Sequence, residues 1–332
     1  MRLLLAPMEG LLDDVLRASL TALGGYDHVV SEFVRVSGTV LPERQFRRLV
    51  PELDNGSRAA SGTPVWVQLL GSDPACMADN AARLATLGPA GVDLNFGCPA
   101  PTVNRHRGGA ALLNEPELLY RIAGAVRAAL PATLPLSAKM RLGIADPGRA
   151  LACAQALEAG GASMLVVHAR TRQDGYRPPA HWPWVGRIAD AVQVPVVANG
   201  EVWTVADWRR CRSEAGVADV MLGRGAVADP FLAARIRAEA MGGANEGETD
   251  PVAERARQWH VLLGLLAEFR ARVGRKVEAR HVGGRIKQWL YLLARAHAPA
   301  AQLFAAIRPL RSVREIDDAL LRHGVPLSGL NA

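Results

Sequence analysis

Residues 1–240 alternate short apolar runs with longer amphipathic stretches, and this alternation restricts the possible folds more than any other feature. We expect eight β-strands, at Leu3–Ala6, His28–Phe33, Val65–Leu69, Val92–Asn95, Leu136–Met140, Met164–His168, Val194–Ala198 and Val220–Leu222. Most of these runs are continuously apolar, as strands buried on both faces of a parallel sheet are. Helical stretches separate most of them, for example Asp73–Leu87, Glu115–Leu130, Gly148–Ala159 and Thr204–Ser213.

Eight strand–helix units in this length favour an α/β fold of the (β/α)₈ TIM-barrel class. A doubly wound open sheet is the alternative. The stretch Met241–Asp250 is rich in Gly and acidic residues and is interpreted as a linker. Amphipathic helices are then expected at Val252–Val273, Val282–His297, Ala300–Arg308 and Val313–Arg322. The predicted domains are a barrel over 1–240, a linker over 241–250 and a small all-helical domain over 251–332.

The charge is concentrated at one end of the chain. Residues 250–332 hold 14 Lys or Arg against 7 Asp or Glu, whereas the preceding residues hold 25 of each sign. A neutral body with a basic C-terminal segment suggests a polyanionic partner. The alternative is a solvated surface in which Arg is used for compositional reasons.

The four cysteines, Cys76, Cys98, Cys153 and Cys211, are scattered without a C-x-x-C pair or a Cys/His cluster. We therefore expect neither structural disulfides nor a structural metal. No apolar run reaches the roughly 18 residues needed to cross a membrane, and the first apolar stretch is too short for a signal peptide. A cytoplasmic protein without a membrane partner is the expectation.

Polar and reactive residues follow the predicted strands, at the end of a barrel where function is usually found. The strand ends carry Ala6-Pro7-Met8-Glu9, Gln68, Asn95 with Cys98, Lys139, His168, Asn199-Gly200-Glu201 and Gly223-Arg224. The glycines near 200 and 223 allow close approach of backbone N–H groups, and a helix N-terminus follows, as a phosphate site requires. The alternative is that they only form tight turns. GRGAVA does not open a βαβ unit, so a dinucleotide-binding domain is not expected.

In their order along the chain, these strand ends resemble the tRNA-dihydrouridine synthases, FMN enzymes built as a TIM barrel with a C-terminal helical domain. The resemblance covers nearly the whole chain and is carried by APMEG, VDLNFGCPAPTV, GGAALL, K-M-R, VVHART, VANGEV and MLGRGA. The segment RIKQWL further resembles the bacterial DusC subgroup, which modifies position 16 of the tRNA D-loop.

The resemblance implies FMN as cofactor and NADPH as reductant, although no nicotinamide-binding motif is visible. It places Ala6, Pro7, Met8, Glu9, Gln68, Lys139, His168, Asn199, Gly200, Glu201, Gly223 and Arg224 at the flavin. Lys139 is one of three lysines in a chain that otherwise uses Arg, so a compact ammonium is needed there. The resemblance sets it near N1 and C2 of the flavin ring. An ion pair with Asp93 or Glu201 is the alternative.

Cys98 is the predicted catalytic acid. Reduction of the uridine C5=C6 bond needs a hydride at C6, from the flavin, and a proton at C5. A thiol with an ordinary pKa of about 8.5 is still protonated at neutral pH and can donate. Cys98 lies between Gly97 and Pro99, just beyond a strand, which indicates an exposed loop. The resemblance places Asn95 near the target base.

Contacts with tRNA are predicted at Arg35, Asn95, Tyr176, Arg285 and Lys287. Arg285 and Lys287 belong to a basic run in the helical segment that could neutralise several phosphates. The run consists of Arg270, Arg272, Arg275, Lys276, Arg280, Arg285 and Lys287. An aromatic such as Tyr176 could stack on an unpaired base. A solvated surface remains the alternative for Arg35, Tyr176, Arg285 and Lys287.

The sequence therefore predicts a monomeric tRNA-dihydrouridine synthase. One rival is an FMN-dependent oxidoreductase of a free pyrimidine, similar to dihydroorotate dehydrogenase, although a small substrate needs no basic helical segment. A second rival is an RNA-binding module with a barrel that has lost its activity.

Overall fold

A computed structural model describes residues 1–105, 107–243 and 251–327 of the chain. The described residues divide into two compact units. The barrel unit comprises residues 1–14 and 26–223, and the helical unit comprises residues 15–25 and 224–332. Most of the predicted linker, residues 244–250, lies outside the described residues. The predicted domain limits at 240 and 251 therefore stay predictions.

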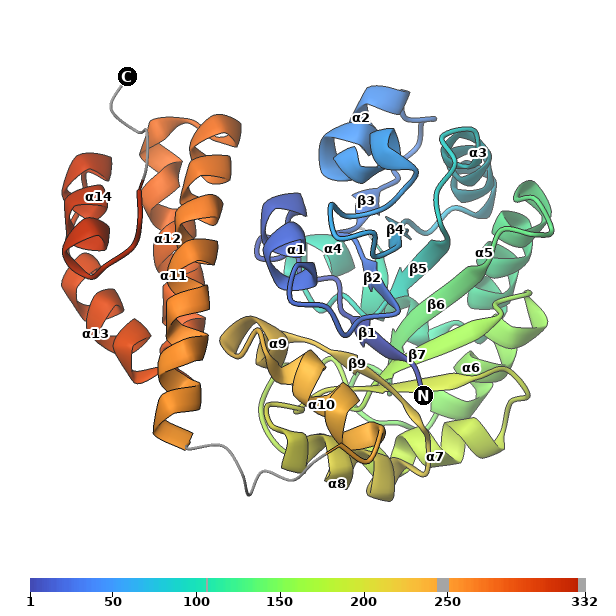
Figure 1. The fold of residues 1–332 in the computed structure, drawn as a ribbon. Coiled ribbons are helices and arrows are strands. Elements are labelled where there is room, and N and C mark those ends of the chain that lie inside the picture. Colours follow the sequence, from blue (N-terminus) through green and yellow to red (C-terminus); the bar gives the residue numbers. More distant parts are fainter. Residues whose placement is uncertain (106, 244–250, 328–332) are drawn as a thin grey trace. The chain divides into compact units, whose positions relative to one another are not determined.

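The barrel unit is built on nine parallel strands, which occupy the centre of that unit in Figure 1. They are β1 (Leu3–Leu5), β2 (His28–Val30), β3 (Val34–Arg35), β4 (Val65–Leu70), β5 (Val92–Phe96), β6 (Leu136–Arg141), β7 (Met164–His168), β8 (Val196–Asn199) and β9 (Asp219–Leu222).

The sheet closes on itself. The first strand pairs with β2 on one side and with β9 on the other, where Leu3 opposes Val220. β2 also pairs with β4, so eight strands complete the ring and β3 is an addition beside β4. The predicted eight-stranded barrel is confirmed, and the doubly wound open sheet is wrong because an open sheet leaves two unpaired edges.

Helices surround the ring within the barrel unit. They are α2 (Glu43–Leu49), α3 (Pro74–Ala85), α4 (Pro101–Arg105), α5 (Pro116–Ala129), α6 (Ala150–Ala159), α7 (Trp182–Asp190) and α8 (Val205–Ala215), with 3₁₀ turns at Pro51–Asn55 and Gly109–Asn114. Two of them start on side-chain caps: Asp73 accepts from the N–H of Cys76, and Thr204 accepts from that of Asp207. Such caps satisfy backbone donors that the first turn leaves unpaired.

The barrel interior is apolar at its centre. One buried cluster joins side chains from five strands or their ends, namely Leu4, Ala6, Val30, Met164, Val166, Val197 and Met221, and Trp66 of β4 packs against it. A filled interior of this kind makes the barrel a solid core. Polar chemistry is therefore confined to the strand ends and to the few polar residues inside the ring.

The helical unit contains α1 (Asp14–Thr21), α9 (Arg224–Ala228), α10 (Leu232–Ala240), α11 (Pro251–Lys276), α12 (Ala279–Leu293), α13 (Ala298–Ile307) and α14 (Val313–Arg322). The long helix α11 buries Leu262, Leu266, Phe269 and Val273, which share one face because they recur at intervals of three and four residues. The indole of Trp289 is buried, meets Phe269 edge-on at 4.7 Å, and donates to the carbonyl of Val227. The predicted C-terminal helices are confirmed. Among the described residues, no helix is both long and apolar enough to span a membrane.

Candidate functional site

The predicted site residues of the barrel unit come from neighbouring strand ends. Strand register places Asn95 of β5 opposite Lys139 of β6, and His168 of β7 opposite Asn199 of β8. Two residues before Asn95 on the same strand, Asp93 lies opposite Gln68 of β4. The carboxyl ends of parallel strands lie on one side of a barrel, so these side chains share one end of the ring.

A hydrogen-bonded chain runs from inside the barrel to the loop after β5. The Gln68 amide donates to the Asp93 carboxylate at 2.6 Å, and the Asn95 amide donates to Oε1 of Gln68 at 2.8 Å. The side-chain oxygen Oδ1 of Asn95 accepts from the backbone N–H groups of Gly97 at 3.0 Å and Cys98 at 2.9 Å. The side chain of Asn95 therefore fixes the backbone that carries Cys98.

The Cys98 loop is also held from its far side. The Asn104 amide and the N–H of Ala110 both donate to the Cys98 carbonyl. A side chain at Gly109 would place its Cβ 2.8 Å from that carbonyl, and Gly109 has φ of +60°, so the close approach requires glycine. These contacts give the thiol a defined position.

The Cys98 thiol is free and partly exposed. Burial raises its pKa above the ordinary value, and the nearby Glu9 carboxylate adds to the increase, whereas a hydrogen bond from the backbone of Ala100 and the charges of Arg141 and Arg35 oppose it. The thiol is therefore protonated at neutral pH. This is the state that a proton donor needs.

Lys139 presents a largely enclosed ammonium. Burial lowers its pKa to about 8, Arg141 adds to the decrease, and the charges of Asp93 and Cys98 oppose it. Among the described residues its Nζ forms no hydrogen bond or salt bridge, because Asp93 accepts from Gln68 and Ser137, and Glu201 pairs with Arg170. The ion pair with Asp93 or Glu201, weighed as an alternative, is not formed.

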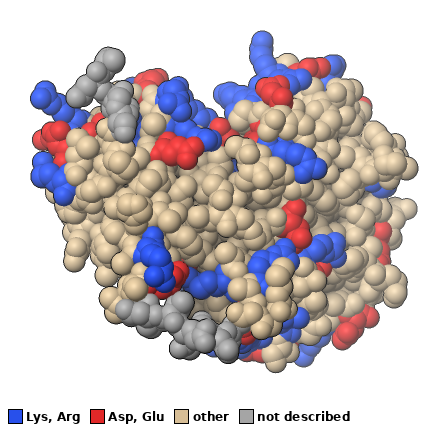
Figure 2. All heavy atoms as spheres, viewed as in Figure 1, with Lys and Arg blue, Asp and Glu red and all other residues tan. Residues whose placement is uncertain are grey.

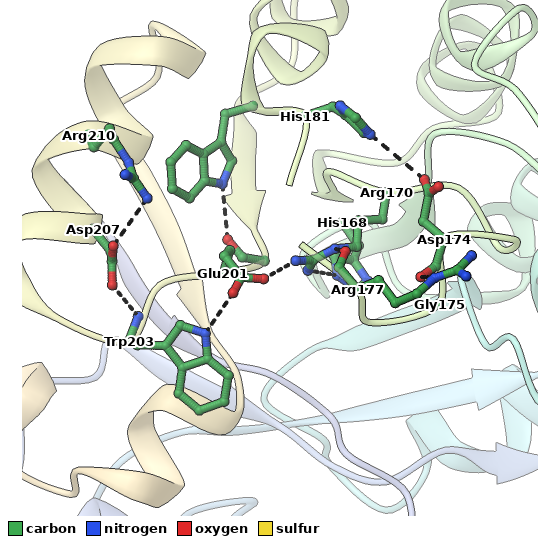
Figure 3. A network of polar contacts seen from close by, with 12 residues as sticks. His168, Arg170, Asp174, Gly175, Arg177, His181, Glu201, Trp203, Asp207 and Arg210 are labelled. Atoms are coloured by element: carbon green, nitrogen blue, oxygen red, sulfur yellow. Dashed lines mark hydrogen bonds and ion pairs between the residues drawn. The ribbon is translucent and has the colours of Figure 1, made fainter. Parts of the chain in front are cut away.

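A network around Arg170 organises the ends of β7 and β8, as Figure 3 shows. The buried guanidinium of Arg170 contacts Nε2 of His168 at 3.4 Å, donates to the carbonyl of Arg177 at 2.7 Å, and forms an ion pair with Glu201. The other oxygen of Glu201 accepts from the Trp203 indole at 3.1 Å. Arg170 thus connects two predicted flavin residues to the loop after β7.

Gly200 is required by its surroundings. Its φ is +116°, and a Cβ there would lie 2.8 Å from the His168 ring. Its carbonyl accepts from the Trp182 indole, and Glu201 follows with a positive φ of 61°. The backbone N–H groups of Gly200 and Glu201 donate to no acceptor within the described part of the chain. Two adjacent unused donors fit the phosphate of a flavin mononucleotide.

The amide residues also fit a flavin ring. Gln68 uses one N–H toward Asp93 and one lone pair toward Asn95, which leaves one donor and one acceptor position on a side chain of this type. Asn199 directs its amide at the carbonyl of Met221.

The segment before α1 begins with buried Ala6, whose backbone N–H donates to the carbonyl of Leu222. It continues through partly buried Pro7 and Met8 and reaches exposed Glu9.

The sequence analysis missed Arg141 as a site residue, although it lies in the quoted K-M-R motif. Its buried guanidinium donates to the carbonyls of Gly97, Thr171 and Gly175 at 2.8–2.9 Å, and lies 5.3 Å from the Tyr176 ring. It therefore ties the Cys98 loop to the loop that carries Tyr176. The hydrogen bonds of Asp93 with Gln68 and Ser137 were not predicted either, and the available signal was a polar residue inside an otherwise apolar strand.

The two predicted tRNA contacts at the rim of the barrel unit are exposed. Tyr176 is 54% exposed and lies 6.0 Å from His168, ring centre to ring centre. Arg35 ends β3 and its guanidinium lies 5.9 Å from the Phe33 ring. Both side chains are accessible to a large ligand.

The basic run of the helical unit is less uniform than its sequence indicates. Arg270 is buried and forms a two-bond ion pair with Asp317, so it stabilises the packing of α11 against α14. Lys287 donates to the carbonyls of Arg308 and Leu310 after α13, and Arg285 lies over Phe269. Figure 2 shows Lys and Arg interspersed with Asp and Glu on the face drawn.

The predicted flavin residues Gly223 and Arg224 fall in different units. Gly223 ends the barrel unit, and Arg224 starts α9 of the helical unit.

Within the described residues, no three His, Cys, Asp or Glu side chains come together as a metal-binding group.

Comparisons with known proteins give a consistent result. A family model described as dihydrouridine synthase (Dus) matches residues 4–319. A protein from Ralstonia nicotianae named tRNA-dihydrouridine(16) synthase is 56% identical over 327 residues, which are 97% of each chain. A protein of the same name from Cupriavidus necator is 55% identical, over 98% of this chain and 97% of its own. The solved structure of a variant of NCR from Zymomonas mobilis is similar in fold, with a TM-score of 0.50 and 16% identity over 72% of this chain and 87% of that chain.

Proposed function

The chain belongs to the dihydrouridine synthase family of flavin-dependent oxidoreductases, and we propose that it reduces uridine to 5,6-dihydrouridine at position 16 of tRNA. The position follows the relatives named for it, which are similar to this chain over nearly its whole length. NADPH is the proposed reductant. The proposed state is a monomer, which sedimentation of the purified protein tests.

The observation that carries the proposal is a protonated thiol on Cys98 at the same end of the barrel as the Lys139 ammonium, which forms no hydrogen bond or ion pair within the described part of the chain. Lys139 lies opposite Asn95 in the strand register, and the side chain of Asn95 holds the backbone N–H of Cys98, so the two groups share one part of the site. A positioned thiol can protonate C5 of uridine, and a nearby cation stabilises negative charge that develops during reduction.

We propose that the cofactor is FMN. When bound, a reduced flavin supplies the hydride for C6 of uridine. The N–H groups of Gly200 and Glu201, which donate to no described residue, support a single phosphate there, with His168 beside them. Gln68, Lys139 and Asn199 would contact the ring. Ala6, Pro7, Met8 and Glu9 are proposed to line the same cofactor, and Gly223 with Arg224 stay predictions from the sequence.

Cys98 then acts on the substrate from its fixed loop. Its thiol gives its proton to C5 while the new C–H bond forms at C6, and the resulting thiolate regains a proton from solvent. Asn95 holds the loop through the N–H groups of Gly97 and Cys98. The target uridine must leave its stack to reach this end of the barrel, and exposed Tyr176 and Arg35 are proposed to receive the surrounding nucleotides.

The test is a map of dihydrouridine in tRNA from a strain that lacks this protein. We expect dihydrouridine at position 16 to disappear and to return with the wild-type gene. Loss at position 20 with position 16 unchanged would retain the enzyme class and overturn the position. Unchanged tRNA with a defect in free pyrimidine reduction would favour the dihydroorotate dehydrogenase-like alternative.

A further inference from the structure

Asp93 is a carboxylate inside the apolar ring of the barrel, with no exposed surface. One of its oxygens accepts from Gln68 and the other from Ser137. Burial raises its pKa to about 6, so it is mostly ionised at neutral pH. Burying a carboxylate is costly unless it is paired and hydrogen-bonded. An apolar residue would fill this strand position at lower cost, which points to a role beyond packing.

The carboxylate determines the direction of the hydrogen bonds above it. An ionised Asp93 can only accept, so the amide nitrogen of Gln68 must face it and the amide oxygen must face Asn95. Asn95 must then turn its nitrogen toward Gln68 and its oxygen toward the N–H groups of Gly97 and Cys98. Those two N–H groups can only donate, so every bond in the chain is satisfied in one arrangement.

The same carboxylate is a negative charge near Lys139. Arg141 on the same strand disfavours the ammonium, whereas the negative charges of Asp93 on β5 and of Cys98 in its thiolate form favour it. On the other side β7 offers the apolar Val166 at this register. Asp93 is thus the ionised group among these that keeps Lys139 charged at neutral pH.

We propose that Asp93 is a positioning residue that orients Gln68 and Asn95 beneath the Cys98 loop and maintains Lys139 as a cation. This inference rests on the proposed function, since it assigns the reason why these groups must be held. Asp93 itself touches neither substrate nor cofactor in this role, and acts through its neighbours.

Two substitutions separate the parts of this role. Asp93→Asn removes the charge but keeps an acceptor for Gln68, because the new amide can donate to the Ser137 hydroxyl. Asp93→Leu has a similar size and removes both charge and acceptor. Ser137→Ala is the matched control, since it deletes one bond to the same carboxylate and leaves the chain to Cys98 intact.

The first measurement is hydrogen exchange at the backbone N–H groups of Gly97 and Cys98 in the purified protein. Asp93→Leu should speed exchange at both by about tenfold, the worth of a weakened hydrogen bond, whereas Asp93→Asn and Ser137→Ala should stay close to wild type. Exchange in α6, which lies outside the chain, reports global stability. Equal rates in Asp93→Leu and Ser137→Ala would overturn the orienting role.

The second measurement is the pH dependence of flavin release, followed by the fluorescence that free FMN regains. The Lys139 cation is present below its pKa of about 8 and is lost as pH rises through that value. Affinity should therefore fall near pH 8 in wild type. In Asp93→Asn and Asp93→Leu the same fall should move down by about 1–3 pH units, the usual effect of losing a close opposite charge.

An unmoved midpoint in Asp93→Asn would overturn the charge role. Neither measurement requires tRNA. A protein that shows both effects yet forms no dihydrouridine would leave Asp93 in this role and reject the proposed function. With tRNA, kcat should fall in Asp93→Leu while KM stays unchanged, because the substrate surface is untouched.

Discussion

Cys98 and Lys139 must both carry their protons for the proposed reaction, although burial affects them in opposite senses. Burial disfavours the thiolate and raises the pKa of Cys98, and it disfavours the ammonium and lowers the pKa of Lys139 to about 8. The thiol therefore stays protonated well above neutral pH, whereas the ammonium is the first to be lost as pH increases. The alkaline limit of activity should belong to Lys139.

Replacing Cys98 by Ala should separate cofactor chemistry from substrate chemistry. We expect the variant to retain its flavin and its oxidation of NADPH, because neither depends on the thiol. Dihydrouridine formation should fall by about 10²–10⁴, the usual worth of a positioned acid, as measured by mass mapping of tRNA after a timed reaction. Cys76→Ala is the control, since that sulfur lies on the first turn of α3. Wild-type turnover by Cys98→Ala would remove the thiol from the mechanism.

Replacing Lys139 by Ala should weaken the binding of flavin, because the ammonium forms no hydrogen bond or ion pair with any described residue and its loss is expected to affect the cofactor. Lys139→Arg keeps the charge but substitutes a planar fork for a compact ammonium, so it should restore only part of the affinity. Flavin release by dilution of the purified protein measures both. Equal affinity in wild type and Lys139→Ala would argue against a contact with the ring.

The residues of the candidate site were predictable where they follow strands, and their partners were not. A pattern of strand ends indicates that Gln68, Asn95 and Lys139 share one end of a barrel. It contains no information on which amide donates to which oxygen, since that depends on strand register. The roles of Asp93, Arg141 and Arg170 were not predicted, because they arise from contacts across 25 to 44 residues of sequence.

At the scale of elements, the sequence predicted the strands of the ring with errors of a few residues. Met164–His168 agrees at both ends with β7. The strand expected over His28–Phe33 instead ends at Val30 as β2, and β3 begins beyond the run at Val34. At Ser31 the side chain accepts from the backbone of Gln68 and donates to the carbonyl of Glu32. The strand expected from Val194 begins at Val196, since Pro195 lacks a donor for the ladder.

The cap of α8 offers a test of how an element supports the site. Thr204 and Asp207 form a reciprocal capping box, and Asp207 also accepts from the N–H of Trp203, whose indole contacts Glu201. Thr204→Ala should lower the free energy of unfolding by about 0.5–2 kcal/mol and weaken flavin binding. Thr204→Ser retains the cap and should behave as wild type. The measurements are denaturant unfolding and flavin release; an unaltered stability would show that the cap is dispensable.

At the scale of the whole molecule, the helical unit should supply much of the affinity for tRNA. Replacing Arg285 and Lys287 by Ala removes two cations, so binding should weaken and the log–log dependence on salt should decrease by up to about two units. Arg44→Ala with Arg48→Ala is the control, an equal change of charge on α2 of the barrel unit. Filter binding at several salt concentrations measures the slopes.

The substitution of Lys287 affects the stability of the helical unit as well as its charge, so that experiment needs a second measurement. Its ammonium binds the carbonyls that follow α13, so its loss also affects the helical unit. The thermal midpoint of the double variant should be compared with that of Arg285→Ala alone. An identical salt slope in the double variant and wild type would place the tRNA surface elsewhere, whatever the midpoint.

The pairing of β1 with β9 affects the order in which a ribosome delivers this chain. β1 can pair with β9 only after residues 219–222 have been synthesised. Gly25 likewise reaches its final contacts only after α10 has been made. Its carbonyl accepts from Arg237, and its backbone packs closely against Ala233. At about 5–20 residues per second, synthesis up to Arg237 takes on the order of 10–50 s. Throughout that interval a strand edge of the nascent chain stays unpaired, which makes β1 a natural point of attachment for a chaperone.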